Sequence, residues 1–182
     1  MALTKITGSG LGALTSDVEA QGSAGATLKL TSTDTTGADT ELLGQIDFVS
    51  SDSSTGSAGT QARIKGVYED NGDSSGLAFI TGASTGSGTP TITERMRVDH
   101  NGNVLVGKTA TTIATQGAQI DSIGRGFFTS DGSYCVLLNR LSSNGTVIKI
   151  HDDGTETGII GVVANQPYFA TPFGSDSGLR WG

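Results

Sequence analysis

Short runs in which apolar and polar residues alternate are the feature that most limits how this chain can fold. Clusters of Gly, Ser, Asn and Asp separate these runs, and the clearest example is TERMRVDHNGNVLVGKT, residues 93–109. Alternation with a period of two predicts β-strands, and Asn101-Gly102 predicts a tight hairpin turn with left-handed backbone. The apolar face of this hairpin holds four residues: Met96, Val98, Val104 and Val106.

The opposite face of the same hairpin carries Arg95, Arg97 and Asp99. Two interpretations stay open for it. The charged side chains form ion pairs across strands or chains, with Glu94 as one partner, or they lie solvated on a free surface. In both cases we expect a structural element here and not a reaction centre.

The same alternation recurs along the chain and predicts an all-β protein of short antiparallel strands. From the run GRGFFTSDGSYCVLLNRLSSNGTVIKIHDDG we expect a three-stranded meander over residues 124–154. The expected strands lie within ATLKLTST (26–33), GQIDFVSS (44–51), ARIKGVYED (62–70), GLAFITG (76–82), GRGFFTS (124–130), SYCVLLN (133–139), GTVIKIHDDG (145–154), TGIIGVVA (157–164) and PYFATP (167–172).

The sequence contains few large apolar residues for a protein that folds as a single copy. Hydrophobic residues make up 35% of the 182 residues and aromatic residues 5%, while 28 residues are glycine. Glycine loses more backbone freedom on folding than any other residue, and little apolar bulk is available to offset that cost. We therefore expect a β-fold whose hydrophobic core is completed by other copies of the chain.

Charge and hydropathy remove several classes of partner. The net charge is −7 and no cluster of Lys and Arg is present, so we expect no nucleic-acid partner. No run approaches the about 18 apolar residues of a membrane span, and the N-terminus lacks the pattern of a signal peptide. The single cysteine, Cys135, lies in a strand-like run and is expected to be a small core residue.

Two stretches carry a resemblance to a known family. ATLKLTSTDT, ELLGQIDFVSSDSSTGSAGTQARIKGVYED, SSGLAFITG and TERMRVDHNGNVLVGKT, in this order, resemble a module of bacteriophage tail-fibre and other virion fibre proteins. GRGFFTSDGSY with LNRLSSNGTVIKIHDDGT resembles a second fibre module, common in phages of aquatic bacteria, and MALTKITGSGLGAL is similar to the N-termini of such proteins. Where the family commonly has GIGT, this chain has LVGKT at residues 105–109.

The resemblance implies an elongated homotrimeric fibre on a virion, in which three chains share one β-core. It also implies that an N-terminal segment joins the fibre to other tail or capsid proteins. We accordingly expect an attachment segment at residues 1–25, a first β-module at 26–109, a linker at 110–117 and a second β-module at 118–182.

No constellation of residues for catalysis or for cofactor binding is recognisable, so we expect no enzyme, no cofactor and no metal site within one chain. GSGLG at residues 8–12 lacks the preceding strand of a phosphate-binding loop. In a trimer, three copies of His151 or Asp152 could meet at the axis and hold an ion, whereas a solvated strand end is the simpler interpretation. Receptor or interface contacts are expected from the late aromatic residues, which would otherwise form a C-terminal core: Tyr168, Phe169, Phe173 and Trp181.

The function expected from the resemblance is that of a trimeric structural fibre protein of a tailed phage, contributing to host attachment. Three alternatives remain. The chain could be an adhesin that recognises a host surface glycan, a head fibre or decoration protein on the capsid, or a polysaccharide depolymerase. Depolymerase chains of this kind are usually far longer, and this alternative is the weakest.

Overall fold

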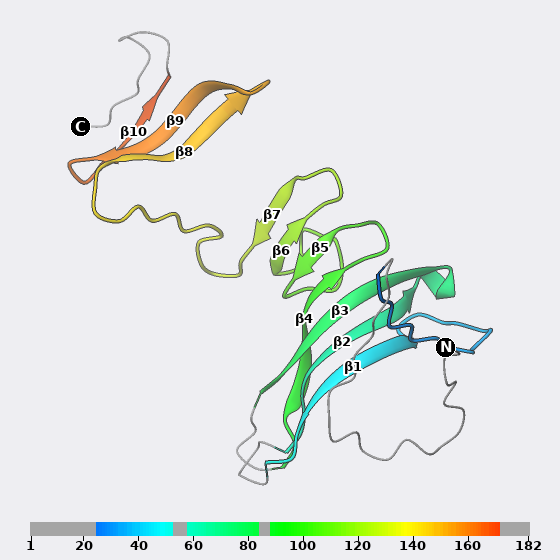
Figure 1. Ribbon diagram of the computed structural model, residues 1–182. Helices are drawn as coiled ribbons and strands as arrows, with labels where there is room; N and C mark the ends of the chain where they lie inside the picture. Colours follow the sequence, from blue (N-terminus) through cyan, green and yellow to red (C-terminus); the bar gives the residue numbers. More distant parts are fainter. Residues whose placement is uncertain (1–24, 53–57, 84–87, 172–182) are drawn as a thin grey trace. The chain divides into compact units, whose positions relative to one another are not determined.

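The computed structural model describes residues 25–52, 58–83 and 88–171 (Figure 1). The chain divides into two compact units, Met1–Phe127 and Phe128–Gly182. Within the described residues the strands pair antiparallel, and the one helical element is a three-residue 3-10 turn at Asp70–Gly72. The mostly-β prediction is therefore confirmed. The attachment segment expected at residues 1–25 lies, except for Gly25, outside the described residues.

The first unit is built on a seven-stranded sheet in which every strand pairs with the next strand of the sequence. Such a meander needs only short connections and places sequence neighbours side by side, as Figure 1 shows. Its strands are β1 (Leu42–Ser50), β2 (Gly59–Glu69), β3 (Ser74–Ala83), β4 (Thr91–Val98), β5 (Val104–Val106), β6 (Gly117–Ile120) and β7 (Gly126–Thr129).

The expected hairpin is present as β4 and β5. Met96 lies directly opposite Val106 and Val98 directly opposite Val104, which confirms that these four residues share one face. In the turn, Gly102 adopts a left-handed backbone with φ +81°, but Asn101 does not. The turn lies between Val98 and Val104, as expected, and it is a three-residue connection closed by hydrogen bonds between Asp99 and Asn103. The left-handed backbone is confirmed at Gly102, whereas its expectation at Asn101 was wrong.

The turn between β6 and β7 repeats that hairpin turn. Asp99 and Asp121 each start an Asp-X-X-Gly sequence, and in both turns the glycine N–H donates to the carbonyl oxygen of the aspartate. Each carboxylate also accepts the backbone N–H groups two and four residues later. An aspartate side chain that caps its own turn in this way favours the turn over extended structure, which explains why both hairpins form here.

The long connection between β5 and β6 belongs to the first sheet. Lys108 is buried, and its ammonium group donates to the carbonyl oxygen of Thr112 at 2.7 Å, so the loop folds back toward β6. The segment 110–117, expected as a linker between modules, therefore connects two neighbouring strands. The unit boundary lies at Phe127/Phe128 and differs from the boundary expected near residue 118.

The second unit contains a three-stranded antiparallel sheet in the order β10-β9-β8. Its strands are β8 (Gly145–Asp152), β9 (Thr155–Val163) and β10 (Gln166–Ala170). Two-residue turns connect them, at Asp153-Gly154 and at Ala164-Asn165, and all four turn residues have positive φ. Paired positive φ values match the right-handed twist of the flanking strands, so both hairpins are tight.

Two expected strands are absent from the structure. Residues 26–33 form no strand, and the first strand of the sheet is β1. Leu30 of this segment packs its side chain against Gly44 of β1. Residues 133–139 form no strand either, and Cys135 is exposed. The meander expected over 124–154 is therefore wrong: β8 takes β9 as its partner, and the meander runs from residue 145 to residue 170.

Candidate functional site

One face of the seven-stranded sheet is apolar across six strands. The pairing register places side chains directly opposite one another in two neighbouring rows, and opposed side chains share a face. The first row is Ile46, Ile64, Phe79, Met96, Val106 and Ala118. The second row is Gly44, Gly66, Leu77, Val98, Val104 and Ile120. We call these two rows, together with Phe48, the apolar face.

None of the large side chains on the apolar face is buried. Five of them are 42–54% exposed: Ile46, Phe48, Leu77, Val106 and Ile120. Burial of such side chains stabilises by about 25 cal/mol per Å² of apolar surface, so a sheet that leaves them in water gives up much of its driving force. Single soluble domains rarely expose a contiguous patch of this kind, which makes the apolar face a candidate association surface.

The opposite face of the sheet is covered by long polar side chains. Across it the register runs through Gln45, Lys65, Ala78, Arg97, Leu105 and Gln119. Ala78 and Leu105 are fully buried there, each between two of these long side chains. The aliphatic stems of Lys and Arg cover apolar neighbours while their charged ends stay near water. We call this the polar face.

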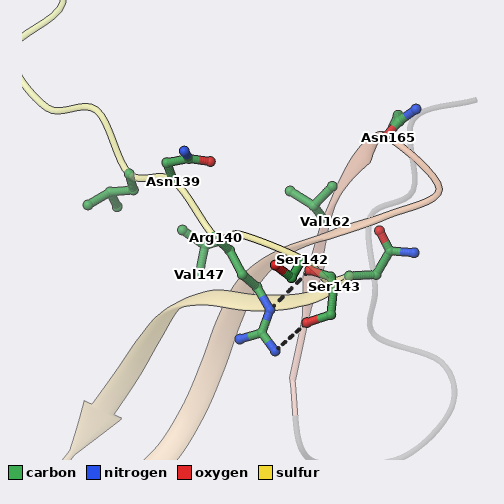
Figure 2. Close-up of a pocket in the computed structure, with 9 residues that line it drawn as sticks. Asn139, Arg140, Ser142, Ser143, Val147, Val162 and Asn165 are labelled. Atoms are coloured by element: carbon green, nitrogen blue, oxygen red, sulfur yellow. Dashed lines mark hydrogen bonds between the residues drawn. The ribbon is translucent and has the colours of Figure 1, made fainter.

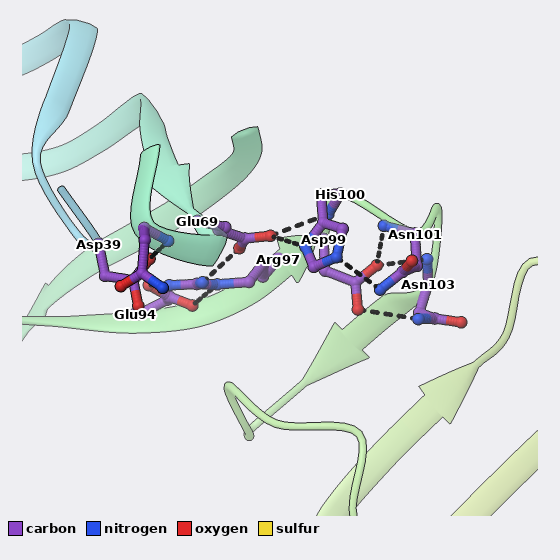
Figure 3. A network of polar contacts seen from close by, with 9 residues as sticks. Asp39, Glu69, Glu94, Arg97, Asp99, His100, Asn101 and Asn103 are labelled. Carbon is purple, nitrogen blue, oxygen red and sulfur yellow. Dashed lines mark hydrogen bonds and ion pairs between the residues drawn. The ribbon is translucent and has the colours of Figure 1, made fainter. Parts of the chain in front are cut away.

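Arg97 is the centre of an ion-pair network on the polar face (Figure 3). Its Nε and Nη2 atoms donate to the two carboxylate oxygens of Glu94, at 2.8 and 3.0 Å, and Nη1 donates to Glu69 Oε1. The three side chains are only 13, 17 and 11% exposed. Of the two interpretations left open for this charged face, ion pairing with Glu94 as a partner is confirmed for Arg97. The solvated alternative is wrong for Arg97, because Glu69 and Glu94 enclose it.

Glu69 also ties the end of β2 to the β4–β5 turn. Its Oε2 atom accepts the backbone N–H of His100 at 2.9 Å and lies 3.0 Å from His100 Nδ1. Burial raises the pKa of the Glu69 carboxyl, but the hydrogen bonds from His100 and Arg97 outweigh burial and hold the pKa below its usual value. Glu69 is therefore ionised in the folded protein, and its carboxylate links β2 to β4 and to the β4–β5 turn.

The two Asp-X-X-Gly turns contact each other. The side-chain amide of Asn103 makes two contacts: Nδ2 donates to Asp99 Oδ2 at 2.8 Å, and Oδ1 accepts the backbone N–H of Ser122 at 3.1 Å. Figure 3 shows Asp99, Asn101 and Asn103 gathered at this end of the sheet. The polar groups of Asp99 and Asn103 have their hydrogen-bond partners within the two turns, so this cluster stabilises the turns and holds them together.

A polar hollow of about 520 Å³ lies in the second unit (Figure 2). The segment 138–144 forms one side, and the other side includes Val147, Val162 and Asn165. The Arg140 guanidinium donates to the backbone oxygen of Ser143 and to its hydroxyl, both at 3.2 Å. Amides, hydroxyls and a guanidinium are groups that can hydrogen-bond a polar ligand, but the hollow also shows that this segment stands away from its own sheet.

Of the four aromatic residues expected as contacts, the structure describes two, Tyr168 and Phe169. Tyr168 and Phe169 are neighbours in β10 and point to opposite faces: Tyr168 lies against Gly161, whereas Phe169 pairs with Ile160 and remains exposed. Phe173 and Trp181 lie outside the described residues. Sequence reasoning missed the larger signal, which is the alignment of apolar residues from separate hairpins into rows.

The two histidines have local partners. His100 joins the Glu69 network, and His151 is exposed at the end of β8, with Nδ1 3.2 Å from the Gly154 carbonyl oxygen. Over residues 25–52, 58–83 and 88–171, no three His, Cys, Asp or Glu side chains of one chain come together as metal ligands. An ion shared by three copies at His151 or Asp152 stays a prediction. In the described part of the chain, no helix has the length and hydropathy needed to cross a membrane.

Comparison with protein-family models, with curated proteins and with solved structures finds no match to this chain.

Proposed function

We propose that this chain is a structural fibre protein of a tailed bacteriophage virion, that it assembles as a homotrimer, and that it contributes to host attachment. The observation that carries the proposal is the apolar face, which one chain leaves in water. The proposal takes the virion and the number of chains from the resemblance of residues 26–109 to phage fibre modules.

The two faces of the sheet support assembly from copies of the same chain. Charged side chains on the polar face already have partners, such as Arg63 with Asp47 and Arg97 with Glu69 and Glu94. The apolar face carries no charged side chain, and Leu30 covers its Gly44 position. Association through this face therefore buries hydrophobic surface without burying an unpaired charge. Three identical chains that each contribute such a face can form one shared core, with residues 1–25 free to join other virion proteins.

The proposal is tested on purified particles of a phage that encodes this chain. Mass spectrometry should detect the chain in the particles, and immunogold electron microscopy with an antibody against residues 26–171 should label fibres on the tail or the head. Particles assembled with a chain that lacks residues 1–25 are the control, and they should lose the label. The proposal is wrong if the chain is abundant in infected cells and absent from purified particles.

A further inference from the structure

The segment 134–141, YCVLLNRL, has the residue types of a β-strand, but its backbone pairs with no strand among the residues that the structure describes. It contains no Gly or Pro, its first six residues carry no charge, and Tyr, Val and Leu fit a pleated, packed surface. The structure gives these residues neither a strand nor a bridge. Their large apolar side chains are 52–76% exposed: Tyr134, Val136, Leu137, Leu138 and Leu141.

A segment of this kind promotes aggregation when it stays exposed to solvent. An uncharged run with high β-propensity and unpaired backbone groups pairs readily with any free sheet edge. A chain that keeps such a run needs a specific partner for it. The run in 134–141 is as apolar as the strands that do pair, so what it lacks is an edge to join.

The three-stranded sheet of the second unit has two edges, β8 and β10, and they are not equivalent. β10 contains Pro167, which cannot donate a backbone hydrogen bond, and proline is a common means of blunting an edge strand. β8 contains no proline over its eight residues. Its edge is therefore the better acceptor for another strand.

The segment does not reach the β8 edge of its own chain as a strand. Ser142 has φ +69°, which turns the chain just before β8, and the polar hollow separates the segment from Val147 and Val162 (Figure 2). The contact with β8 comes from the side chain of Arg140: its Nη1 atom donates a hydrogen bond to the Thr146 carbonyl oxygen at 3.4 Å. One weak side-chain contact occupies an edge on which several backbone bonds could form.

We propose that residues 134–141 of one copy add as a strand to the outer edge of β8 of a second copy. This inference rests on the self-association in the proposed function, and it names a contact separate from the apolar face. The exchanged strand covers the exposed leucines and pairs the free backbone groups of β8. Because the second copy is identical, each chain both donates a segment and accepts one.

Cysteine cross-linking tests this contact, because Cys135 lies in the segment and is the single cysteine of the chain. Ile148→Cys and Lys149→Cys place a thiol on β8, and consecutive positions point to opposite faces, so one of them lies on the same face of the sheet as Cys135 of the added strand. Gln166→Cys places the thiol on β10 of the same sheet and is the matched control. Each variant is treated with a short bismaleimide, and the products are separated by mass under denaturing conditions.

Strand pairing holds two thiols at an effective concentration on the order of mM, so a β8 variant should link two chains at least roughly tenfold faster than the Gln166→Cys control. Peptide mapping should join residue 135 to residue 148 or 149. Linkage that stays within one chain overturns the inference, and so does an oligomer in which the β8 variants link no faster than the control; both leave the proposed function standing. A sample that sediments as a single chain overturns the proposed function, and this inference with it.

Discussion

Replacing Arg97 by Gln tests whether the ion-pair network stabilises the sheet. Arg97 contacts Glu94 through two hydrogen bonds and Glu69 through a third, and all three side chains are less than one-fifth exposed. Gln fits the same strand and keeps most of the side-chain volume. The substitution therefore removes the cation and leaves two carboxylates enclosed with no opposite charge.

The expected cost follows from the geometry of these pairs. Two unit charges about 4 Å apart attract by about 4 kcal/mol at an effective dielectric constant of 20. Part of this energy offsets the cost of burying Arg97, and part is lost to solvent because the carboxylates keep some exposure. Breaking a buried pair usually costs about 3–5 kcal/mol, so we expect Arg97→Gln to lower the free energy of unfolding by about 2–4 kcal/mol.

The matched control is Arg125→Gln in the same unit. Arg125 pairs with a single carboxylate, that of Asp121, and its own side chain is 67% exposed. The Asp121 side chain is only 8% exposed, but it also accepts the backbone N–H groups of Ile123 and Arg125, which the substitution leaves in place. An ion pair whose cation lies largely in water contributes about 0–1 kcal/mol, so this control should change stability less than Arg97→Gln does. Urea unfolding followed by circular dichroism gives both values, with all variants at one protein concentration because folding and assembly are linked.

A double-mutant cycle of Arg97→Gln with Glu69→Gln then isolates the pair from other effects of each substitution. We expect a coupling energy of about 1–3 kcal/mol between these two residues. Equal destabilisation by Arg97→Gln and Arg125→Gln, together with a coupling energy near zero, would refute the network as a source of stability.

Three further predictions concern the β4–β5 turn, the loss of stability at low pH and the apolar face. Gly102→Val should destabilise by about 1–3 kcal/mol more than Gly102→Ala in urea unfolding, because φ is +81° and a β-branched residue tolerates positive φ poorly. The pKa of Glu69 is lower in the folded protein than its unfolded value of 4.5, so its ionised carboxylate stabilises the fold above pH 4.5. This contribution is lost as the pH falls through the folded pKa. Urea unfolding at pH 7 and at acid pH should therefore show a smaller loss of stability for Glu69→Gln than for the parent chain. Val98→Asp should cost several kcal/mol in the assembled protein, as for any unpaired buried charge, and concentration-dependent melting should show the loss.

The hairpin at residues 93–106 shows what the sequence can predict. The alternation of apolar and polar residues is local, so it was sufficient to place Met96, Val98, Val104 and Val106 on one face. The burial of Arg97 depends on Glu69, a residue 28 positions earlier that β3 brings alongside, and no local pattern contains this information. Leu105 was missed for the same reason, because its cover comes from the long side chains of neighbouring strands.

The segment 134–141 shows the opposite case. Its residue types favour a strand as those of the other strands do, yet it pairs with no strand in the described part of the chain. A strand needs a neighbour as well as a propensity, and sequence reasoning supplied a wrong neighbour by assuming pairing with β8 of the same chain. The apolar face was likewise visible only as separate hairpins until the register joined them into rows.

Sedimentation equilibrium of the parent chain and two isoleucine variants tests the central claim most directly. Ile120 lies on the apolar face and Ile123 in the nearby turn, and in one chain they are 52% and 74% exposed, so Asp at either position should leave the single chain folded. The parent and Ile123→Asp should sediment as three times the 18.4 kDa chain mass, whereas Ile120→Asp should shift toward the mass of one chain. A parent chain that sediments as a folded monomer, or an Ile120→Asp variant that assembles as well as Ile123→Asp, would contradict the account.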